Sequence, residues 1–370
     1  EMGAVASVEL NHCGNPANPI GVDFAIGPMD MVREDGTRVK AMDDYWINET
    51  ANKYADAAEF CKDCGMGMIM VHCGHGGLHS QFLSPLTNQR DDEYGGSAVN
   101  RARFTKLVLQ RIRDRVGPDF IIEARVGVDE FAPGGATVED SITLFKEIED
   151  IIDIAHCSGG LHSIERLVVR THPTLFYPRG CNSHLAAEVK KAGIKIPVLT
   201  VGALQTPEFG EKLLEEGKAD LVAYCRPLLA DPEMPNKARR GDVDDIRPCT
   251  RCLHCHSGLD EPRQVECAVN PVVGKEWRVK QMSPAKMPRD VMVIGGGPAG
   301  MMAALTLSDR GHAVTLFEAS DHLGGQLNFA DFASFKSSLA AYKRWLIAQV
   351  QRRPIVVRFQ CRPTAQQLKS

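Results

Sequence analysis

Over the first 240 residues, short apolar runs alternate with stretches whose apolar residues recur at helical spacing. Such runs are typical of strands buried on both faces of a parallel sheet, and the stretches between them are typical of the helices that cover it. The pattern predicts strands at residues 5–10, 66–71, 120–126, 151–155, 198–201 and 219–223. It predicts helices at residues 47–64, 100–116, 138–148, 182–192 and 207–216, and a polar loop up to residue 39.

This alternation indicates an α/β protein. Most of the strands run into a loop that carries Gly, His or Arg, which favours a (β/α)8 TIM barrel over residues 1–240. Only six units are visible, so we expect the first two units of the barrel to be absent from this chain. A doubly wound parallel sheet is the alternative. The sequence starts at Glu1 and ends just after a strand-like run, which suggests a segment of a longer protein.

The pattern changes twice beyond the barrel. Residues 241–288 have few apolar runs, clustered cysteines and several prolines, which is typical of a loop-rich linker organised by a metal centre. From Asp290 onward a new strand–helix–strand pattern begins. It predicts the start of a Rossmann-like dinucleotide-binding domain over residues 289–370, truncated at the end of the chain.

Composition narrows the classes of function. Hydrophobic residues make up 44% and charged residues 24% of the 370 residues, which excludes a wholly disordered chain. The net charge of −4 offers no basic excess for nucleic acid or an anionic membrane. No apolar run reaches the ~18 residues of a membrane span, and no export signal is visible. Twelve cysteines without the framework of a small secreted module favour a reducing, cytoplasmic location.

Four of the cysteines form a motif with the spacing C-x2-C-x2-C-x11-C. They are Cys249, Cys252, Cys255 and Cys267. Three thiolates two residues apart can reach three corners of an iron–sulfur cube, and a distant fourth completes it, so the spacing predicts a 4Fe-4S cluster. A zinc site, which usually takes two separated pairs, and purely structural thiols are the alternatives.

A second motif begins the last domain. Gly295, Gly297 and Gly300 follow an apolar run, and a second apolar run ends at Glu318. The glycines allow a tight turn that brings a helix N-terminus onto a pyrophosphate, and the acid about 20 residues later accepts from a ribose hydroxyl. This context predicts dinucleotide binding.

The third candidate site lies at predicted strand ends of the barrel. His72 and His75 follow one strand, and two imidazoles three residues apart could donate hydrogen bonds to one carbonyl oxygen. The alternatives are histidines that pack or are solvated, and a metal site completed by His79. In the next strand, residues 120–124 lead to Arg125, which is expected at the mouth of the barrel. Phosphate binding is expected at the last two strands, which end in the sets Gly202, Ala203 and Cys225, Arg226, although Arg226 could also be a surface residue.

With these motifs in place, the chain resembles the old yellow enzyme superfamily over nearly its whole length. The most specific passage is residues 80–90, continued by residues 92–96 and 100–104. The likeness is to the multidomain iron–sulfur flavoproteins, a branch that includes 2,4-dienoyl-CoA reductase, trimethylamine dehydrogenase and gut-bacterial ene-reductases.

The resemblance implies FMN in the barrel, with electrons passing from NADH or NADPH through FAD and the 4Fe-4S cluster. It implies that Arg125 faces flavin N1/O2, that His72 and His75 hold a substrate carbonyl, and that His162 is an active-site histidine. It also assigns Gly202, Ala203, Cys225 and Arg226 to the FMN phosphate region, and Gln326 with its preceding glycines to FAD rather than NAD.

Two positions depart from the family pattern. Glu9 stands where most members have a flavin-binding Gln, and Gly77 stands where many have a proton-donating Tyr. The first change affects flavin tuning. The second leaves room for a bulky substrate and passes proton donation to another group, for which His162 is the best candidate and His79, Tyr177 and solvent are weaker ones.

The expected function is therefore NAD(P)H-dependent reduction of an activated C=C bond in a small enone or enoate. Oxidative dealkylation of an amine is an alternative, although that chemistry favours an aromatic bowl and aromatic residues make up only 6% of the chain. An iron–sulfur electron-transfer scaffold without catalysis is another. Neither nucleic acid nor membrane is expected as a partner, and assembly into a homo-oligomer stays open.

Overall fold

The computed structural model describes residues 3–257, 264–279, 284–364 and 366. By their packing, the residues form two compact units. The first comprises Glu1–Pro173, Arg179–Leu204 and Phe209–Ala223, and the second comprises Thr174–Pro178, Gln205–Glu208 and Tyr224–Ser370. The longest continuous part of the second unit begins at Tyr224. None of the described helices has the length and apolar character needed to cross a membrane.

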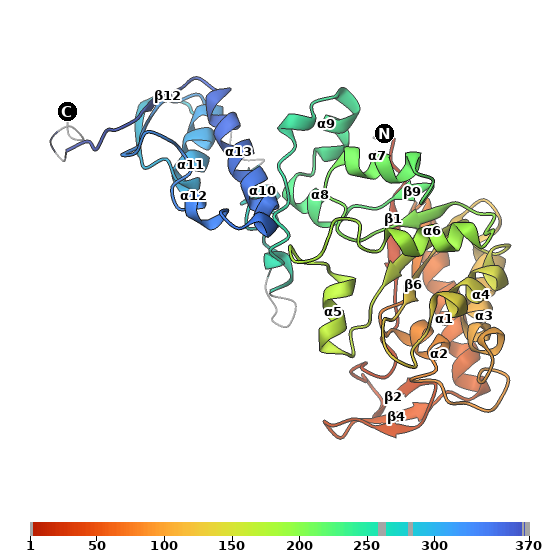
Figure 1. Cartoon of the computed structure of the whole chain (residues 1–370). Coiled ribbons are helices and arrows are strands. Elements are labelled where there is room, and N and C mark those ends of the chain that lie inside the picture. The colour runs from red at the N-terminus through yellow and green to blue at the C-terminus, as the bar shows by residue number, and fades with distance from the viewer. Residues whose placement is uncertain (1–2, 258–263, 280–283, 365, 367–370) are drawn as a thin grey trace. The chain divides into compact units, whose positions relative to one another are not determined.

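The first unit is built on a six-stranded parallel sheet (Figure 1). The strands lie in chain order, with no point at which the order reverses. A doubly wound sheet would require such a reversal, whereas consecutive units of a (β/α)8 barrel do not. The α/β barrel prediction is confirmed. The strands are β1 (Ser7–Leu10), β5 (Met68–Cys73), β6 (Ile121–Asp129), β7 (Ile154–Gly159), β8 (Val198–Thr200) and β9 (Leu221–Val222).

Helices connect these strands, and the long ones begin at side-chain caps. Asp43, Ser97 and Thr137 each accept a hydrogen bond from a backbone N–H of the first turn, so the otherwise unpaired donors are satisfied. In Figure 1, α1, α3 and α4 lie side by side along one flank of the sheet. The helices are α1 (Asp44–Asp63), α2 (Leu78–Leu83), α3 (Ala98–Val116), α4 (Val138–Ile148), α5 (Glu165–Thr171), α6 (Ser183–Lys191) and α7 (Pro207–Glu215).

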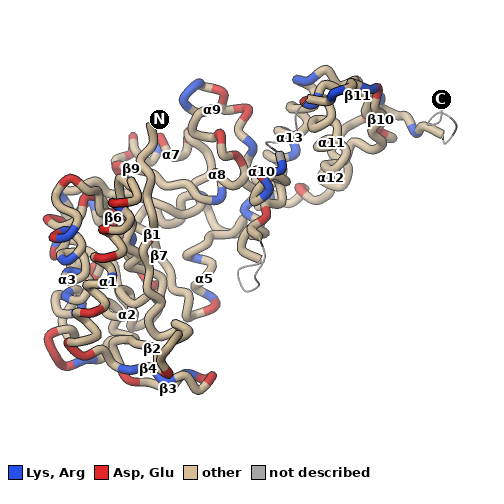
Figure 2. Tube along the Cα trace, turned by 180° about the vertical axis from the view of Figure 1, so that it is seen from behind, with Lys and Arg blue, Asp and Glu red and all other residues tan. Residues whose placement is uncertain are grey.

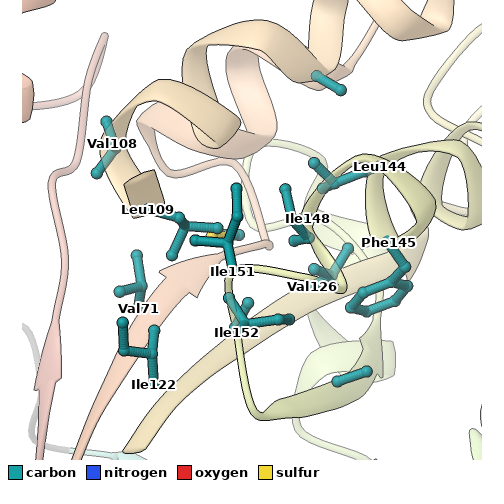
Figure 3. Packing of buried hydrophobic residues seen from close by; sticks show 14 of the residues in the cluster. Val71, Val108, Leu109, Ile122, Val126, Leu144, Phe145, Ile148, Ile151 and Ile152 are labelled. Atoms are coloured by element: carbon teal, nitrogen blue, oxygen red, sulfur yellow. The ribbon is translucent and has the colours of Figure 1, made fainter. Parts of the chain in front are cut away.

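The two faces of the strands differ in chemistry. Residues that point toward the helices are apolar and fully buried: Val71, Ile122 and Val126 pack against Leu109 and Ile148 (Figure 3). Burial of this surface is the main favourable contribution to the stability of the unit. Because side chains alternate along a strand, the intervening positions point away from this core, and several of them are charged or are histidines. This second face carries the candidate site.

Charged residues of both signs are interspersed along α1 and α3 (Figure 2). Several form exposed ion pairs between helices, including Arg115 with Asp56 and Lys106 with Glu147. Such pairs contribute little to stability. Both signs of charge are thus mixed along these helices.

A small sheet was not expected. Residues 11–39 were predicted to be a polar loop, but β2 (Phe24–Gly27) pairs in parallel with β4 (Arg38–Ala41), and β3 (Met31–Val32) pairs with β4 in the antiparallel direction. These strands have only two to four residues each, so they lack the apolar run by which the longer strands are recognised.

The second unit contains a three-stranded parallel sheet in the order β10-β11-β12. This is the order of the first three strands of a Rossmann fold. Met301 and Leu346 pack beneath the sheet against Leu316, and Ala230 and Val269 belong to the same core. The strands are β10 (Asp290–Ile294), β11 (Ala313–Phe317) and β12 (Ile355–Arg358). The helices are α8 (Arg226–Ala230), α9 (Met234–Arg240), η1 (Val243–Asp245), η2 (His254–His256), α10 (Glu276–Val279), α11 (Pro298–Asp309), α12 (Leu327–Ala330), η3 (Ser334–Lys336) and α13 (Ser337–Gln351).

Candidate active site

A layer of polar residues crosses three neighbouring strands. His72 of β5, Arg125 of β6 and His156 of β7 are directly paired in the parallel register and therefore point to the same face. Both β5 and β6 are longer at their ends than the sequence predicted. His72 and Arg125 consequently lie within strands, and the expectation that they follow strand ends was wrong. His75 alone of the two candidate imidazoles lies in the loop.

Four side chains form a continuous hydrogen-bonded chain along this face. Oε1 of Glu9 lies 2.6 Å from Nδ1 of His72, and Nε2 of His72 lies 3.1 Å from Nδ1 of His75. Nε2 of His75 lies 2.8 Å from Oγ of Ser158. The chain joins β1, β5, the loop after β5 and β7. Both nitrogens of both imidazoles thus already have partners within the protein.

The backbone of His75 is held in an unusual conformation. Its φ of +59° lies in the left-handed region, which costs a non-glycine residue free energy and persists where the surroundings fix it. His75 forms an isolated parallel bridge with Leu161, and the carbonyl of His75 accepts a hydrogen bond of 3.2 Å from the backbone N–H of His162. The loops after β5 and β7 are therefore tied together at the candidate site.

A stack of imidazoles extends from His75. The ring of His162 stacks on that of His75 with centroids 5.5 Å apart, and His172 stacks on His162 with centroids 5.4 Å apart. Nε2 of His162 is 3.0 Å from Oγ1 of Thr171, which is also 2.7 Å from Nδ1 of His172. The structure therefore brings all three predicted catalytic histidines, His72, His75 and His162, into one cluster.

The two ends of the hydrogen-bonded chain differ in their ionisation. The hydrogen bond from His72 lowers the pKa of Glu9, and the positive charge of Arg125 acts in the same direction, with Nη1 of Arg125 3.8 Å from the Glu9 carboxylate. Burial lowers the pKa of His75 well below its usual range, and Arg125 adds to this shift. At neutral pH, Glu9 is therefore ionised and His75 is neutral.

A second carboxylate–histidine pair lies deeper on the same face. Nδ1 of His156 is 2.5 Å from Oε1 of Glu123, and both residues are buried. Burial lowers the pKa of His156, although Glu123 opposes the shift. Sequence reasoning missed this pair, because nothing in the spacing of residues 123 and 156 indicates that they meet.

The passage of highest family likeness acts as a scaffold for the site. The amide of Gln81 donates to the carbonyls of Cys13 and Gly76 and accepts from the N–H of Asn15, so it ties the loop after β1 to the loop after β5. Two nearby hydroxyls, those of Ser80 and Ser84, donate to the buried Glu130 at the end of β6.

Two predictions about α2 need correction. His79 is buried between Tyr54 and Phe104, with Nδ1 3.1 Å from Oγ1 of Thr105, and burial lowers its pKa to about 3. It is a core residue and is unsuited to donate a proton or complete a metal site. At Gly77, a β-carbon would lie 3.2 Å from Oδ1 of Asn11, so the loop after β1 takes part of the room expected there.

The face around Arg125 suits an electron-rich group such as FMN. The Nε atom of Arg125 is buried and has no hydrogen-bond partner among the described residues, so an acceptor is needed there. Near the end of β8, Gly202 has a φ of +129° and Ala203 a φ of +52°. Both lie in the first unit, whereas Cys225 and Arg226 lie in the second.

Within the second unit, all four motif cysteines line one pocket. Arg226 lines it too, and its positive charge favours the thiolate forms of Cys249 and Cys255. Burial has the larger, opposite effect and raises the pKa of Cys249 to about 11. This placement of Arg226 was not expected from the phosphate assignment. The cysteines are Cys249, Cys252, Cys255 and Cys267.

The cysteine pocket has the donor set expected for an iron–sulfur cluster. Among the residues that the structure describes, no three His, Cys, Asp or Glu side chains are placed to hold one metal ion. A cube that takes one thiolate at each of its four irons needs ligands farther apart than a tetrahedral zinc does. The donor set, four thiols around one pocket, is therefore compatible with a 4Fe-4S cluster.

The glycine motif forms the predicted strand–turn–helix. Gly295 has a φ of +99° after β10, and α11 begins directly after Gly297. A β-carbon on Gly300 would come within 1.9 Å of the Gly295 carbonyl, so only glycine permits this close approach. The carboxylate of Glu318 accepts from the N–H of Gly296 at 2.7 Å. Gln326 follows Gly324 and Gly325 and occupies the N-cap position of α12 without a side-chain capping hydrogen bond. The turn suits a dinucleotide pyrophosphate.

Proteins of known name are similar in sequence to most of this chain. It is 38% identical to an NADH oxidase of Thermoanaerobacter brockii over 96% of this chain and 55% of the relative. It is 33% identical to a cinnamate reductase of Clostridium sporogenes over 81% of this chain and 47% of the relative. The chain thus spans about half the length of these relatives.

Solved structures share its fold. A 2-naphthoyl-CoA reductase in complex with 2-naphthoyl-CoA is 31% identical, with a TM-score of 0.92 over 99% of this chain and 58% of that one. Histamine dehydrogenase from Rhizobium sp. 4-9 is 27% identical, with a TM-score of 0.91 over 99% of this chain and 54% of that one. An FAD-dependent oxidoreductase family model matches residues 290–353. The model of the NADH:flavin oxidoreductase / NADH oxidase family matches residues 1–245, and this chain belongs to that family.

Proposed function

We propose that this protein reduces an activated C=C bond conjugated to a carbonyl group. The observation that carries the proposal is the meeting of His72, His75 and His162 beside Arg125, at the face of the barrel strands opposite the apolar core. The polar ring nitrogens are concentrated where a carbonyl oxygen and a flavin can both be held. The cinnamate and naphthoyl-CoA reductases among the relatives support this reading, since both names describe conjugated substrates.

Each residue has a distinct role in the proposal. His72 and His75 bind the substrate carbonyl oxygen and so polarise the double bond. Arg125 faces the flavin and stabilises negative charge there, and Glu9 opposes it. His162, the exposed middle ring of the imidazole stack, donates a proton to the α-carbon.

The cofactor sites are assigned to the residues that fit them. FMN is held by Arg125 with Gly202 and Ala203, and FAD by the glycine turn with Glu318 and Gln326. The four motif cysteines hold a 4Fe-4S cluster, next to which Arg226 lies. When bound, these groups supply the hydride and carry electrons from NADH or NADPH.

Amine oxidation is the second candidate, because histamine dehydrogenase shares the fold over 99% of this chain. A cationic amine is best bound by the faces of Trp, Tyr or Phe. At this site the gathered rings are the imidazoles His72, His75, His162 and His172, which would repel a cation when protonated. The ring chemistry therefore favours the carbonyl substrate.

Turnover under anaerobic conditions separates the candidates. We expect the purified full-length protein, loaded with flavin and iron, to oxidise NADH or NADPH with a panel of enones and aryl enoates and to leave an amine panel unchanged. His72→Ala should abolish enone turnover, while His322→Ala, at an exposed histidine of the second unit, should retain it. Turnover of amines alone would replace the proposal, and no turnover of either would favour an electron-transfer scaffold.

A further inference from the structure

The hydrogen-bond chain of Glu9, His72, His75 and Ser158 allows only one arrangement of protons when Glu9 is ionised and both imidazoles are neutral. The carboxylate can only accept, so His72 carries its proton on Nδ1 and its Nε2 is an acceptor. Nδ1 of His75 must then donate to it, so Nε2 of His75 is also an acceptor and Ser158 donates its hydroxyl proton. Every contact then pairs one donor with one acceptor.

This arrangement limits what the two histidines can bind. The imidazoles carry one N–H each, and Glu9 takes the one on His72. The Nδ1–H of His75 could reach a substrate oxygen only by leaving Nε2 of His72, whose lone pair would then repel that oxygen. Two donors to one carbonyl oxygen therefore require one more proton than the resting chain holds.

We propose that Glu9 is a positioning residue that fixes the proton positions of both histidines, and that the chain binds a carbonyl oxygen with two donors only when it takes up one proton. The inference deepens the proposed function of this site and rests on it for the carbonyl. The extra proton comes from a solvent hydronium ion and attaches to the Glu9–His72 pair. No other bond forms or breaks, and the released species is water.

In the absence of substrate, uptake of the same proton reverses donor and acceptor in the two hydrogen bonds that the His75 ring makes. The incoming proton attaches to Nε2 of His75, and the Nδ1 proton of His75 passes to Nε2 of His72. His72 then donates to both Glu9 and His75, and Nε2–H of His75 donates to Ser158, which becomes the acceptor. The two imidazoles change together, because they share a single proton across the 3.1 Å contact.

The charged groups around the hydrogen-bond chain determine which residue holds the additional positive charge. Arg125 and the neighbouring His162 and His172 disfavour additional positive charge at His75, and Arg125 and His156 act on Glu9. The Glu9 carboxylate favours positive charge at His72, its direct partner. The additional positive charge is therefore held on His72, at the Glu9 end of the hydrogen-bond chain.

Nitrogen-15 NMR of the histidine-labelled holoenzyme tests the proposal without turnover, because the two neutral tautomers and the imidazolium have separate ring-nitrogen shifts. At neutral pH and above, we expect His72 and His75 both to carry their proton on Nδ1, the less common tautomer in water. On lowering the pH, His75 should change to the Nε2–H form in the same transition in which His72 becomes doubly protonated.

Variants separate positioning from folding. Glu9→Leu should return both histidines to the Nε2–H form, and Glu9→Gln, whose amide oxygen still accepts from His72, should restore the Nδ1–H form. Asp321→Asn, which changes an exposed carboxylate–histidine pair of the second unit, should leave His72 and His75 as they are. The proposal is overturned if His75 keeps its tautomer in Glu9→Leu, or if it does not change as His72 gains its second proton. Enone turnover does not enter these outcomes, so a wrong substrate class would be recognised separately.

Discussion

The imidazole of His162 stacks on that of His75 with planes 21° apart, while its Nε2 contacts Thr171 rather than His75. A proton on His162 can therefore leave toward a substrate without first breaking the hydrogen-bond chain of His75. We expect His162→Ala to slow the oxidation of reduced enzyme by an enone by about 100-fold, the usual effect of a positioned acid. Stopped-flow measurement of the two half-reactions should show normal reduction by NADH. His172→Ala, in the outer ring of the same stack, should have a much smaller effect, and equal slowing in both variants would contradict the assignment.

The cysteine pocket predicts the metal content. Cys252→Ser should remove the iron, leave FMN bound, and stop NADH-driven turnover, because a cube needs one thiolate at each iron. Turnover with an artificial donor that reduces FMN directly should survive. Cys64→Ser, at an exposed cysteine at the end of α1, should keep four irons per chain by elemental analysis. Zinc in place of iron in the unaltered protein would refute the cluster.

The charge of Glu9 allows a prediction of how its substitution changes the reduction potential of the flavin. The hydrogen bond from His72 lowers the pKa of Glu9, so the carboxylate is charged at neutral pH, and Glu9→Gln removes a negative charge. Coulomb's law gives about 4 kcal/mol for unit charges ~4 Å apart at an effective dielectric constant of ~20. Because reduced flavin gains negative charge, its potential should rise in Glu9→Gln and fall in Arg125→Ala. Spectroscopic redox titration measures both, and a lower potential in Glu9→Gln would be inconsistent with the proposal.

The burial of His79 predicts acid sensitivity. Its pKa is lowered from 6.5 to about 3 in the folded protein, so the unfolded chain binds one more proton in this range. The free energy of unfolding therefore has its full value above pH 6.5 and decreases as the pH falls toward 3, by about 1.4 kcal/mol per pH unit. In urea unfolding, His79→Leu should have a shallower pH dependence by up to that slope. Thr105→Val removes the same hydrogen bond but keeps the imidazole, so it should lower stability and retain the slope; a flattened slope there would count against burial as the cause.

The two glycines of the dinucleotide turn should respond differently to alanine. At Gly300 a β-carbon would meet the Gly295 carbonyl at 1.9 Å, so Gly300→Ala should lower the melting temperature and lose FAD. At Gly297 the nearest atom is 4.0 Å away, so Gly297→Ala should fold normally and only weaken FAD binding, through crowding of the pyrophosphate. Melting curves with and without added FAD distinguish the two, and equal melting temperatures would contradict the packing argument.

The parts of the fold that sequence could predict are those with a strong apolar period. All six barrel strands were recognisable because continuous apolar runs mark burial on both faces. The helix α2 was not, because all six of its residues are buried, including His79, Ser80 and Gln81, and it shows no polar face. The end of β5 was placed too early, at residue 71 instead of Cys73, since His72 interrupts the apolar run while remaining in the strand.

The site divides in the same way. His72, His75 and Arg125 could be singled out because they follow or interrupt apolar strands. Ser158 and His172 could not, because their importance comes from contacts with residues 83 and 10 positions away in the chain, which no local pattern reveals. Arg226 was assigned a phosphate, and only the folded second unit shows that it borders the cysteines.

The amide of Gln81 has a consequence for how such an enzyme can diverge. Because one side chain fastens the loops that follow two different barrel strands, neither loop is a separate module that can be exchanged alone. A new segment at residues 11–15 must present its carbonyl and N–H to Gln81 as the present one does, or residues 74–77 lose their support. Substrate preference in this barrel should therefore change through side-chain substitutions that leave the loop backbones unchanged. A loop taken from a relative should be accepted only when the loops after β1 and β5 are exchanged together.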